Sequence, residues 1–159
     1  MTKLPNFHAC FVCGDRNAAG LGVRFRTDGE RVYTTFTARK PHMGFHQTTH
    51  GGILATLLDE TMGWAPVLVN RRFCVTVELS VKYIQPAPLG TELTVAGWVT
   101  GGRRRIWEAE GEITDNLGTV YARGKGRYML LGAEKTREVL EYLTFDEECV
   151  SPDLITDTN

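Results

Sequence analysis

A histidine and two glycines stand directly before an apolar segment that has helical spacing. The stretch HGGILATLLDE runs from His50 to Glu60. The first turn of a helix leaves backbone N–H groups without partners inside the helix, and the positive end of the helix dipole lies behind them. Gly51 and Gly52 have no side chains to block these donors. The segment therefore predicts a place for a polarised oxygen, as in an oxyanion hole, although a glycine needed only for the turn is the simpler alternative.

Two adjacent acids, Asp59 and Glu60, follow on the same segment. At 100° per residue, the large apolar residues fall on one side of the helix and Asp59 on the other, among small residues that include Gly52 and Gly63. Small side chains let a ligand or a second backbone come close, and glycine inside a helix costs about 1 kcal/mol relative to alanine. Asp59 is therefore a candidate functional residue, and a solvated helix aspartate is the alternative. Glu60 lies at the edge of the apolar side.

Cysteine and histidine residues could in principle bind a metal. Cys10 and Cys13 form a single CxxC pair, which supplies half of a four-ligand zinc site, with only His8 close by in sequence. Three histidines at a spacing of four (His42, His46 and His50) fall in a loop without a carboxylate among them. A redox pair would fit better beside a βαβ pattern, which is absent. We expect buried, reduced thiols in a leader that packs on the sheet, with no metal and no cofactor.

The overall composition excludes several classes of protein. The 159 residues include 18 basic and 19 acidic side chains, for a net charge of −1, so a nucleic-acid partner is not expected. We expect no apolar run to reach the roughly 18 residues of a membrane helix, and the N-terminus lacks the apolar segment of a signal peptide. We therefore expect a cytoplasmic protein with no membrane partner.

The elements that must position these residues follow from hydrophobic periodicity. Apolar residues alternate on both sides of a turn at 27–30, which predicts a hairpin over 20–38. A helix is expected from residue 51 to about 65, where Pro66 would kink or close it. Further strands are expected from residue 72, over 91–100, over 103–114 after a Gly101-Gly102 turn, and over 119–130, followed by a helix over 133–143 and a loose tail.

This order predicts an α+β protein in which one central helix covers a strongly curved antiparallel sheet of about six strands. We expect a single domain over residues 1–159. It would consist of an irregular leader over 1–19, a core over 20–130, and a C-terminal helix and tail over 131–159.

Two segments resemble a known family. HGGILATLLDE is similar to the helix-opening motif of hotdog-fold acyl-CoA thioesterases of the PaaI kind, in the 4-hydroxybenzoyl-CoA thioesterase superfamily, and TVELSVKYIQPAPLG over 76–90 also fits that pattern. CFVCGDRNAAGLGVRF over 10–25 resembles the leader of one bacterial branch. The resemblance covers residues 20–130 in outline. It implies a hotdog fold, dimers or dimers of dimers whose sheets join edge to edge, and active sites between subunits.

The resemblance also implies roles for individual residues. Asp59 matches the catalytic carboxylate, which acts as general base or nucleophile, and the Gly51 N–H matches the donor to the thioester carbonyl. His50 matches the motif histidine. Thr76 matches a residue that holds the attacking water from the other subunit, while Gly52 and Glu60 would contact the substrate.

One departure concerns an amide that relatives often carry six or seven residues before the motif histidine. Gly44 and Met43 occupy these positions here, and Gln47 or His46 could substitute. Because CoA carries phosphates, Arg103 and Arg105 are further candidates, since they would share one strand face; a solvated sheet edge is the alternative.

The function that follows is hydrolysis of an acyl-CoA thioester, with CoA as part of the substrate and no separate cofactor. Two alternatives stay open. A hydratase or dehydratase acting on acyl thioesters would share the fold, and a non-catalytic module that binds or senses acyl-CoA would fit the missing amide.

Overall fold

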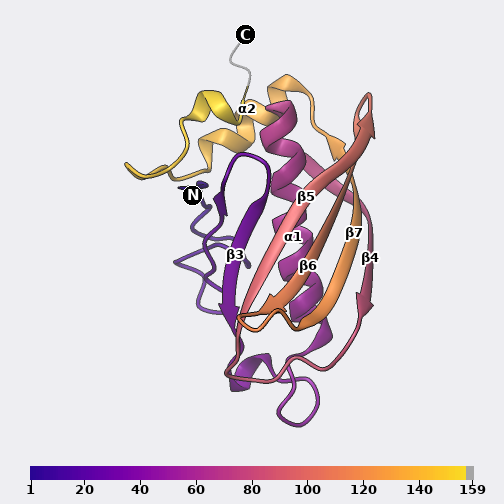
Figure 1. Cartoon of the computed structure of the whole chain (residues 1–159). Coiled ribbons are helices and arrows are strands. Elements are labelled where there is room, and N and C mark those ends of the chain that lie inside the picture. The colour runs from indigo at the N-terminus through magenta and orange to yellow at the C-terminus, as the bar shows by residue number, and fades with distance from the viewer. Residues whose placement is uncertain (157–159) are drawn as a thin grey trace.

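A curved antiparallel sheet wraps one long helix in a computed structural model that describes residues 1–156 (Figure 1). The sheet has seven strands in the order β1-β2-β3-β5-β6-β7-β4, and the helix is α1 (Gly51–Asn70). The strands are β1 (Thr2–Lys3), β2 (Arg26–Thr27), β3 (Val32–Thr37), β4 (Cys74–Tyr83), β5 (Glu92–Arg103), β6 (Ile106–Asp115) and β7 (Val120–Leu130). The predicted architecture is confirmed, and the one strand beyond the expected six is the two-residue β1.

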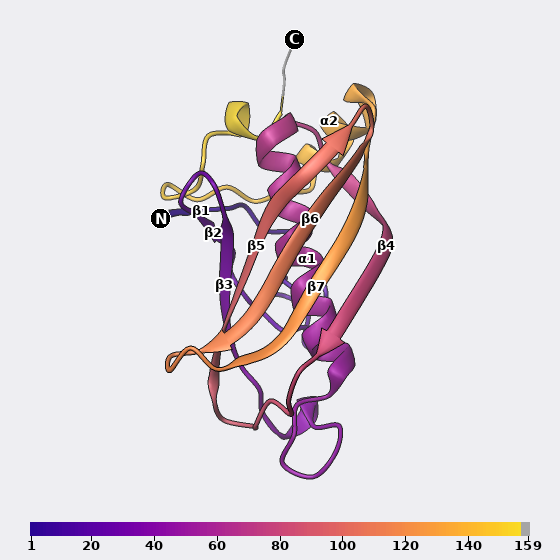
Figure 2. The same cartoon turned by 45° about the vertical axis from the view of Figure 1, so that its right-hand side comes forward.

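Three further short helices lie outside this core. They are η1 (Lys40–His42) before α1, α2 (Ala133–Glu141) after the last strand, and η2 (Pro152–Leu154) near the C-terminus. In Figure 2, α1 lies in the concave side of β5, β6, β7 and β4, while α2 and the C-terminal segment lie together near the end of α1. The helix predicted over 133–143 is confirmed as α2.

Helix α1 approaches the sheet closely because three central strands present a row of glycines. Gly97 of β5, Gly111 of β6 and Gly124 of β7 are paired side by side. A Cβ at Gly97 would lie 2.9 Å from the Thr61 carbonyl oxygen, and one at Gly111 would lie 2.9 Å from Met62 Cγ. The side chain of Met62 is fully buried in this row. The glycines therefore set the depth at which α1 packs, at the turn directly after Asp59.

The end of α1 was predicted wrongly. The helix continues past Pro66 to Asn70, and Arg71 closes it in a left-handed conformation with φ of 53°. Proline inside a helix removes one hydrogen bond. Trp64, Pro66 and Val67 are all buried in the core, and their packing offsets this loss.

By length and composition alone, α1 could cross a membrane, which corrects the expectation that no apolar run is long enough. It has 20 residues and a mean hydropathy of 1.2 over its 18-residue window. Half of that window is buried inside the protein, as in a core helix, so the finding is weak evidence for a membrane span.

The hairpin between β5 and β6 turns later than predicted. Gly101 and Gly102 lie inside β5, and the turn is made by Arg104 and Arg105, with φ of 58° at Arg104. The Trp107 ring packs directly against the backbone at Gly102, where a Cβ would lie only 2.4 Å from the ring. Position 102 therefore requires glycine. The two arginines predicted to share a strand face therefore do not share one.

The hairpin predicted over 20–38 and the predicted loose tail also differ from the structure. Residues 21–25 bond to the leader rather than forming a long strand, as in the bond from the Leu21 N–H to the Phe11 carbonyl. Up to residue 156 the tail is not loose, because Val150 and Ile155 are buried and the Val150 N–H donates to the Lys3 carbonyl. The last three residues of the predicted tail, 157–159, lie outside the described residues. The leader and the described part of the tail thus pack on the core.

Candidate active site

Asp59 is held by hydroxyl groups from two strands. The Thr76 hydroxyl of β4 donates to Asp59 Oδ1 at 2.9 Å. The Tyr128 hydroxyl of β7 lies 3.1 Å from the Asp59 backbone oxygen and 3.4 Å from Oδ1. Thr76 and Tyr128 are direct neighbours in the β4–β7 pairing, so both reach the same point on α1. The carboxylate is thereby fixed in direction while it stays half-buried.

This geometry corrects one expectation. Thr76 was expected to reach the site from a second subunit, but it bonds to Asp59 of its own chain. The reason is the register of β4, which runs back along α1 and places Thr76 beside the third turn of the helix. Tyr128 was not predicted, because its strand lies 69 residues from Asp59 in sequence and only the sheet order brings the two together.

Asp59 faces a pocket of about 240 Å³ with largely apolar walls. The pocket lies between the second half of α1, the start of β4, the leader and the segment around α2. Its lining includes Phe7, Cys10, Cys13, Asp59, Glu60, Gly63, Trp64, Val67, Phe73, Cys74, Thr76, Tyr128, Val139 and Leu143. A carboxylate at the wall of an apolar pocket is suited to act on a bound organic substrate.

The surroundings of Asp59 shift the pKa values of its neighbours. Burial, together with the negative charge of Asp59, raises the pKa of the Cys74 thiol to about 12. The same two causes raise the pKa of the Tyr128 hydroxyl above its usual range. Both groups therefore stay protonated, so Tyr128 can act as a hydrogen-bond donor to Asp59.

The start of α1 is organised by His50. His50 Nδ1 accepts the Gly52 N–H at 2.9 Å, so His50 is the N-cap of the helix. The N–H groups of Ile53 and Leu54 both point to the His50 carbonyl oxygen. Among residues 1–156, the Gly51 N–H is then the one donor of the first turn for which no partner is found. The structure thus separates the two glycines, with Gly52 bonded to the cap and Gly51 available to a ligand.

Tyr83 is a second residue that the sequence did not suggest for this end of the site. Its hydroxyl donates to the Gly51 carbonyl oxygen at 2.9 Å. Its ring lies so close that a Cβ at Gly51 would be 3.2 Å away. The last residue of β4 therefore crosses the first residue of α1.

The amide that relatives often carry has no room at position 44. A Cβ at Gly44 would lie 2.8 Å from His50 Cα, and the Gly44 N–H is bonded to the Thr48 carbonyl. Gln47 and His46 are both exposed in this loop, and Gln47 has a positive φ of 56°. The two candidates lie near His50 in the chain, and no hydrogen bond among the described residues ties either side chain to the helix start.

Arg103 and Arg105 lie away from the residues around Asp59 and from those around Gly51. Across the sheet, Arg103 of β5 lies opposite Ile106 of β6, then Met129 of β7 and Val75 of β4. Val75 is the neighbour of Thr76, so Arg103 lies three strands away from Thr76, or roughly 14 Å at about 4.8 Å per strand. The Arg105 guanidinium donates twice to the Leu130 carbonyl oxygen, at 2.9 and 3.1 Å. The structure therefore ties Arg105 to the end of β7 and does not bring Arg103 to the pocket.

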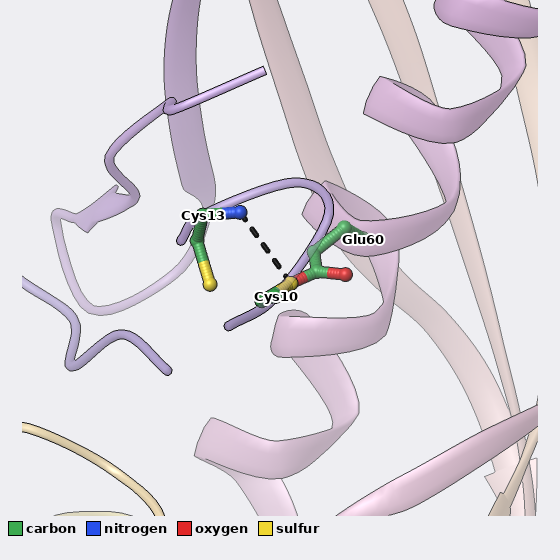
Figure 3. Close-up of side chains that lie close together, drawn as sticks. All are labelled: Cys10, Cys13 and Glu60. Carbon is green, nitrogen blue, oxygen red and sulfur yellow. Dashed lines mark hydrogen bonds between the residues drawn. The ribbon is translucent and has the colours of Figure 1, made fainter. Parts of the chain in front are cut away.

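Glu60 points from α1 toward the leader loop that carries Cys10 and Cys13 (Figure 3). Cys10 Sγ lies 3.6 Å from Glu60 Oε1, and Cys10, Cys13 and Glu60 form one cluster. Burial, reinforced by the Cys10 sulfur, raises the pKa of the Glu60 carboxyl to about 8. Of the three histidines at a spacing of four, His50 caps α1 through Nδ1, and His42 Nδ1 accepts the Arg39 N–H.

Comparison with known proteins agrees with the fold. The family model described as the thioesterase superfamily matches residues 46–122. That range begins just before α1 and ends within β7, so it contains both Gly51 and Asp59. No curated protein matches the sequence.

Solved structures similar to this chain have the same architecture. One is a thioesterase superfamily protein with 30% sequence identity and a TM-score of 0.70; the match covers 77% of this chain and 60% of that chain. The E. coli PaaI protein from the phenylacetic acid degradation operon has 22% identity, coverage of 74% and 86%, and a TM-score of 0.66. A hypothetical thioesterase protein from Streptococcus pneumoniae TIGR4, crystallised with coenzyme A, has 23% identity, coverage of 65% and 82%, and a TM-score of 0.60.

Proposed function

We propose that the chain, which matches the thioesterase superfamily model over residues 46–122 and has the hotdog fold, hydrolyses an acyl-CoA thioester to a free acid and CoA. The observation that carries the proposal is the Asp59 carboxylate, which is fixed by Thr76 and Tyr128 at the wall of an apolar pocket. The coenzyme A bound to the streptococcal protein supports CoA as part of the substrate.

In the proposed reaction, Asp59 either takes a proton from the attacking water or attacks the carbonyl carbon itself. The first route gives a tetrahedral intermediate directly, and the second gives an anhydride that water then hydrolyses. The Thr76 hydroxyl bonds to Oδ1, so Oδ2 is the oxygen left to act. Charge on the thioester oxygen is stabilised by the Gly51 N–H at the positive end of α1. CoA leaves as the thiol.

Asp59 and Gly51 are too far apart on one helix to act on one carbonyl directly. Eight residues at 1.5 Å per residue separate them by about 12 Å along the axis. Direct attack needs the carboxylate about 3 Å from a carbon whose oxygen is about 3 Å from the N–H donor. We therefore include in the proposal that Asp59 of one chain works with Gly51 of a second copy.

The edge of the sheet offers a place for this second copy. Strand β4 is ten residues long and pairs only with β7 among the described strands, so its outer edge is open. Val75 and Val77 on β4 are 43% and 49% exposed. A long edge with exposed valines is suited to antiparallel pairing with the same strand of another chain. Such pairing would also bring two α1 helices to neighbouring places.

The first experiment measures release of free thiol from short, medium, long and aromatic acyl-CoAs by the purified full chain. We expect release from at least one class at a rate well above that in buffer. Binding without thiol release would instead indicate an acyl-CoA-binding module, and hydration of an enoyl thioester without thiol release would indicate a hydratase. Either result would overturn the proposed hydrolysis.

The shared site is tested by mixing two inactive variants. Asp59→Asn lacks the carboxylate and Gly51→Pro lacks the N–H, so a mixed dimer holds one site with both groups intact. We expect activity to return after the two are unfolded together and refolded. If the mixture stays as inactive as the separate variants while sedimentation shows mixed dimers, the two groups do not act across chains.

A further inference from the structure

Three potential metal ligands from two distant parts of the chain meet beside the pocket. The Sγ atoms of Cys10 and Cys13 and a carboxylate oxygen of Glu60 all lie within 4.8 Å of one another. Figure 3 shows the Cys10 and Glu60 side chains converging from the leader loop and from α1. The sequence alone supplied only the two cysteines, because Glu60 is 50 residues away.

The leader loop is shaped to hold a thiolate. The Val12 and Cys13 N–H groups both point to Cys10 Sγ, at 3.2 and 3.4 Å. The loop closes tightly, with the Gly14 N–H donating to the Cys10 carbonyl oxygen at 3.0 Å and no space for a Cβ at Gly14. Two backbone N–H groups aimed at one sulfur stabilise negative charge on it, so the geometry of this loop suits a thiolate ligand.

Glu60 supplies the third donor from the rigid core helix. It is half-buried, and its carboxylate oxygen lies 3.6 Å from Cys10 Sγ. Two thiols and a carboxyl in one partly buried place cannot all ionise without a cation to balance them. Metal–sulfur and metal–oxygen bonds of about 2.3 and 2.1 Å place the donors of a tetrahedral site roughly 3.5–4 Å apart. The distance of 3.6 Å from Cys10 Sγ to Glu60 Oε1 lies in this range, and Cys13 Sγ lies within 4.8 Å of both atoms.

We propose that Cys10, Cys13 and Glu60 bind one divalent thiophilic cation, zinc in the first instance, which ties the leader to α1 next to Asp59. Two thiolate ligands select a soft or borderline ion over magnesium or calcium. Binding releases the thiol protons to solvent, and the three donors carry three negative charges against two on the ion. The fourth position faces the pocket that the three residues share with Asp59.

No other residue among the described 1–156 completes the site. His8 is the nearest candidate in sequence, but its Nε2 is paired with the Thr144 hydroxyl at 2.9 Å and its Nδ1 with Asp15. Cys74 lines the same pocket, but its thiol donates to the Gly63 carbonyl oxygen. The fourth ligand is therefore water or a donor brought in by a ligand, as in open zinc sites.

A reversible Cys10–Cys13 disulfide is the competing interpretation. It would use the same two sulfurs but would leave the Glu60 carboxyl without its sulfur partner, in a half-buried position. The metal site uses all three groups. The two interpretations predict opposite results for metal binding under reducing conditions, which makes them separable.

The test measures zinc and cobalt binding by the full chain, purified in a phosphine reductant and freed of metal with a chelator. We expect one Zn²⁺ per chain by elemental analysis, and a thiolate-to-metal charge-transfer absorption when Co²⁺ replaces it. Titration of the native protein with a mercurial should release that one zinc as two thiols react, which needs no variant.

Matched variants locate the site. Cys10→Ser and Cys13→Ser should lose the zinc and the charge-transfer absorption, and Glu60→Gln should bind zinc more weakly. Cys74→Ser and Cys149→Ser should keep both signals, with circular dichroism as the check on folding.

Absence of Zn²⁺ and Co²⁺ binding by the reduced wild type would overturn the proposal, as would zinc retained by Cys10→Ser. Because the readout is metal content, failure here leaves the thiol-release test of the proposed hydrolysis unaffected.

Discussion

Replacing Gly51 by proline deletes one backbone N–H at the place where the oxyanion is proposed to bind. Proline is well tolerated at the first position of a helix, where its missing N–H breaks no helical bond. Gly51 is that position, and the preceding His50 has φ of −60° and ψ of 132°, which suits a residue before proline. The change should therefore leave α1 folded and remove only the donor.

The expected loss follows from the partners of the first turn. The N–H groups of Gly52, Ile53 and Leu54 all point to His50, so Gly51 carries the one donor for which no partner is found within residues 1–156. Removing one oxyanion donor typically lowers kcat about 100- to 1000-fold, or about 2.7–4 kcal/mol. With no second backbone donor to compensate at this helix end, we expect a loss within that range.

Gly51→Ala is the matched control, because it keeps the N–H and adds only a Cβ. That Cβ would lie 3.2 Å from the ring of Tyr83, an exposed side chain that can shift by a few tenths of an ångström. Steady-state thiol release and far-UV circular dichroism should be measured for both variants. Equal rates for Gly51→Pro and wild type, with equal helix content, would refute the assignment of this donor, as would equal losses for the proline and alanine variants.

Further predictions concern the neighbours of Asp59 and the sheet edge. Tyr128→Phe should lower the free energy of unfolding in urea by about 1 kcal/mol, since it removes one buried hydroxyl that bonds to Asp59, and an unchanged value would contradict this role. Cys74 should be alkylated slowly near pH 8, because a pKa of about 12 leaves roughly one Cys74 thiol in 10,000 ionised. Alkylation should be faster in Asp59→Asn, which removes a charge that raises that pKa. If mass spectrometry showed Cys74 to be the first thiol labelled, the result would be inconsistent with this prediction. The double change Val75→Lys and Val77→Lys should shift sedimentation toward the monomer, and a dimer of unchanged stability would place the interface elsewhere.

The parts of the fold that depend on local pattern could be predicted from the sequence. The start of α1 followed from the glycines and the apolar spacing after them, and the long strands followed from alternation. The end of α1 could not be predicted, because Pro66 is a local signal to stop and only burial by the sheet overrides it. The glycines of β5, β6 and β7 were equally ambiguous, since each alone weakens a strand and only their alignment explains them.

Some residues of the candidate site could likewise be predicted from local sequence, and others depend on tertiary packing. Asp59 and Gly51 could be predicted as candidates because they share one helix with a recognisable spacing. Tyr128, Tyr83 and the link between Cys10 and Glu60 depend on strand order and on how the leader packs, and no local signal carries them. The expectation that Arg103 and Arg105 share a face was wrong because the hairpin turns at the arginines themselves.

The most direct test of the central claim is thiol release by Asp59→Asn from the best acyl-CoA substrate of the wild type. Asparagine keeps the shape of the side chain and can still bond to Thr76, but it cannot accept a proton or form an anhydride. The proposal predicts that kcat falls about 100- to 10,000-fold, with helix content unchanged. Glu138→Gln on the exposed face of α2 should retain the wild-type rate. Hydrolysis by Asp59→Asn at the wild-type rate would contradict the account.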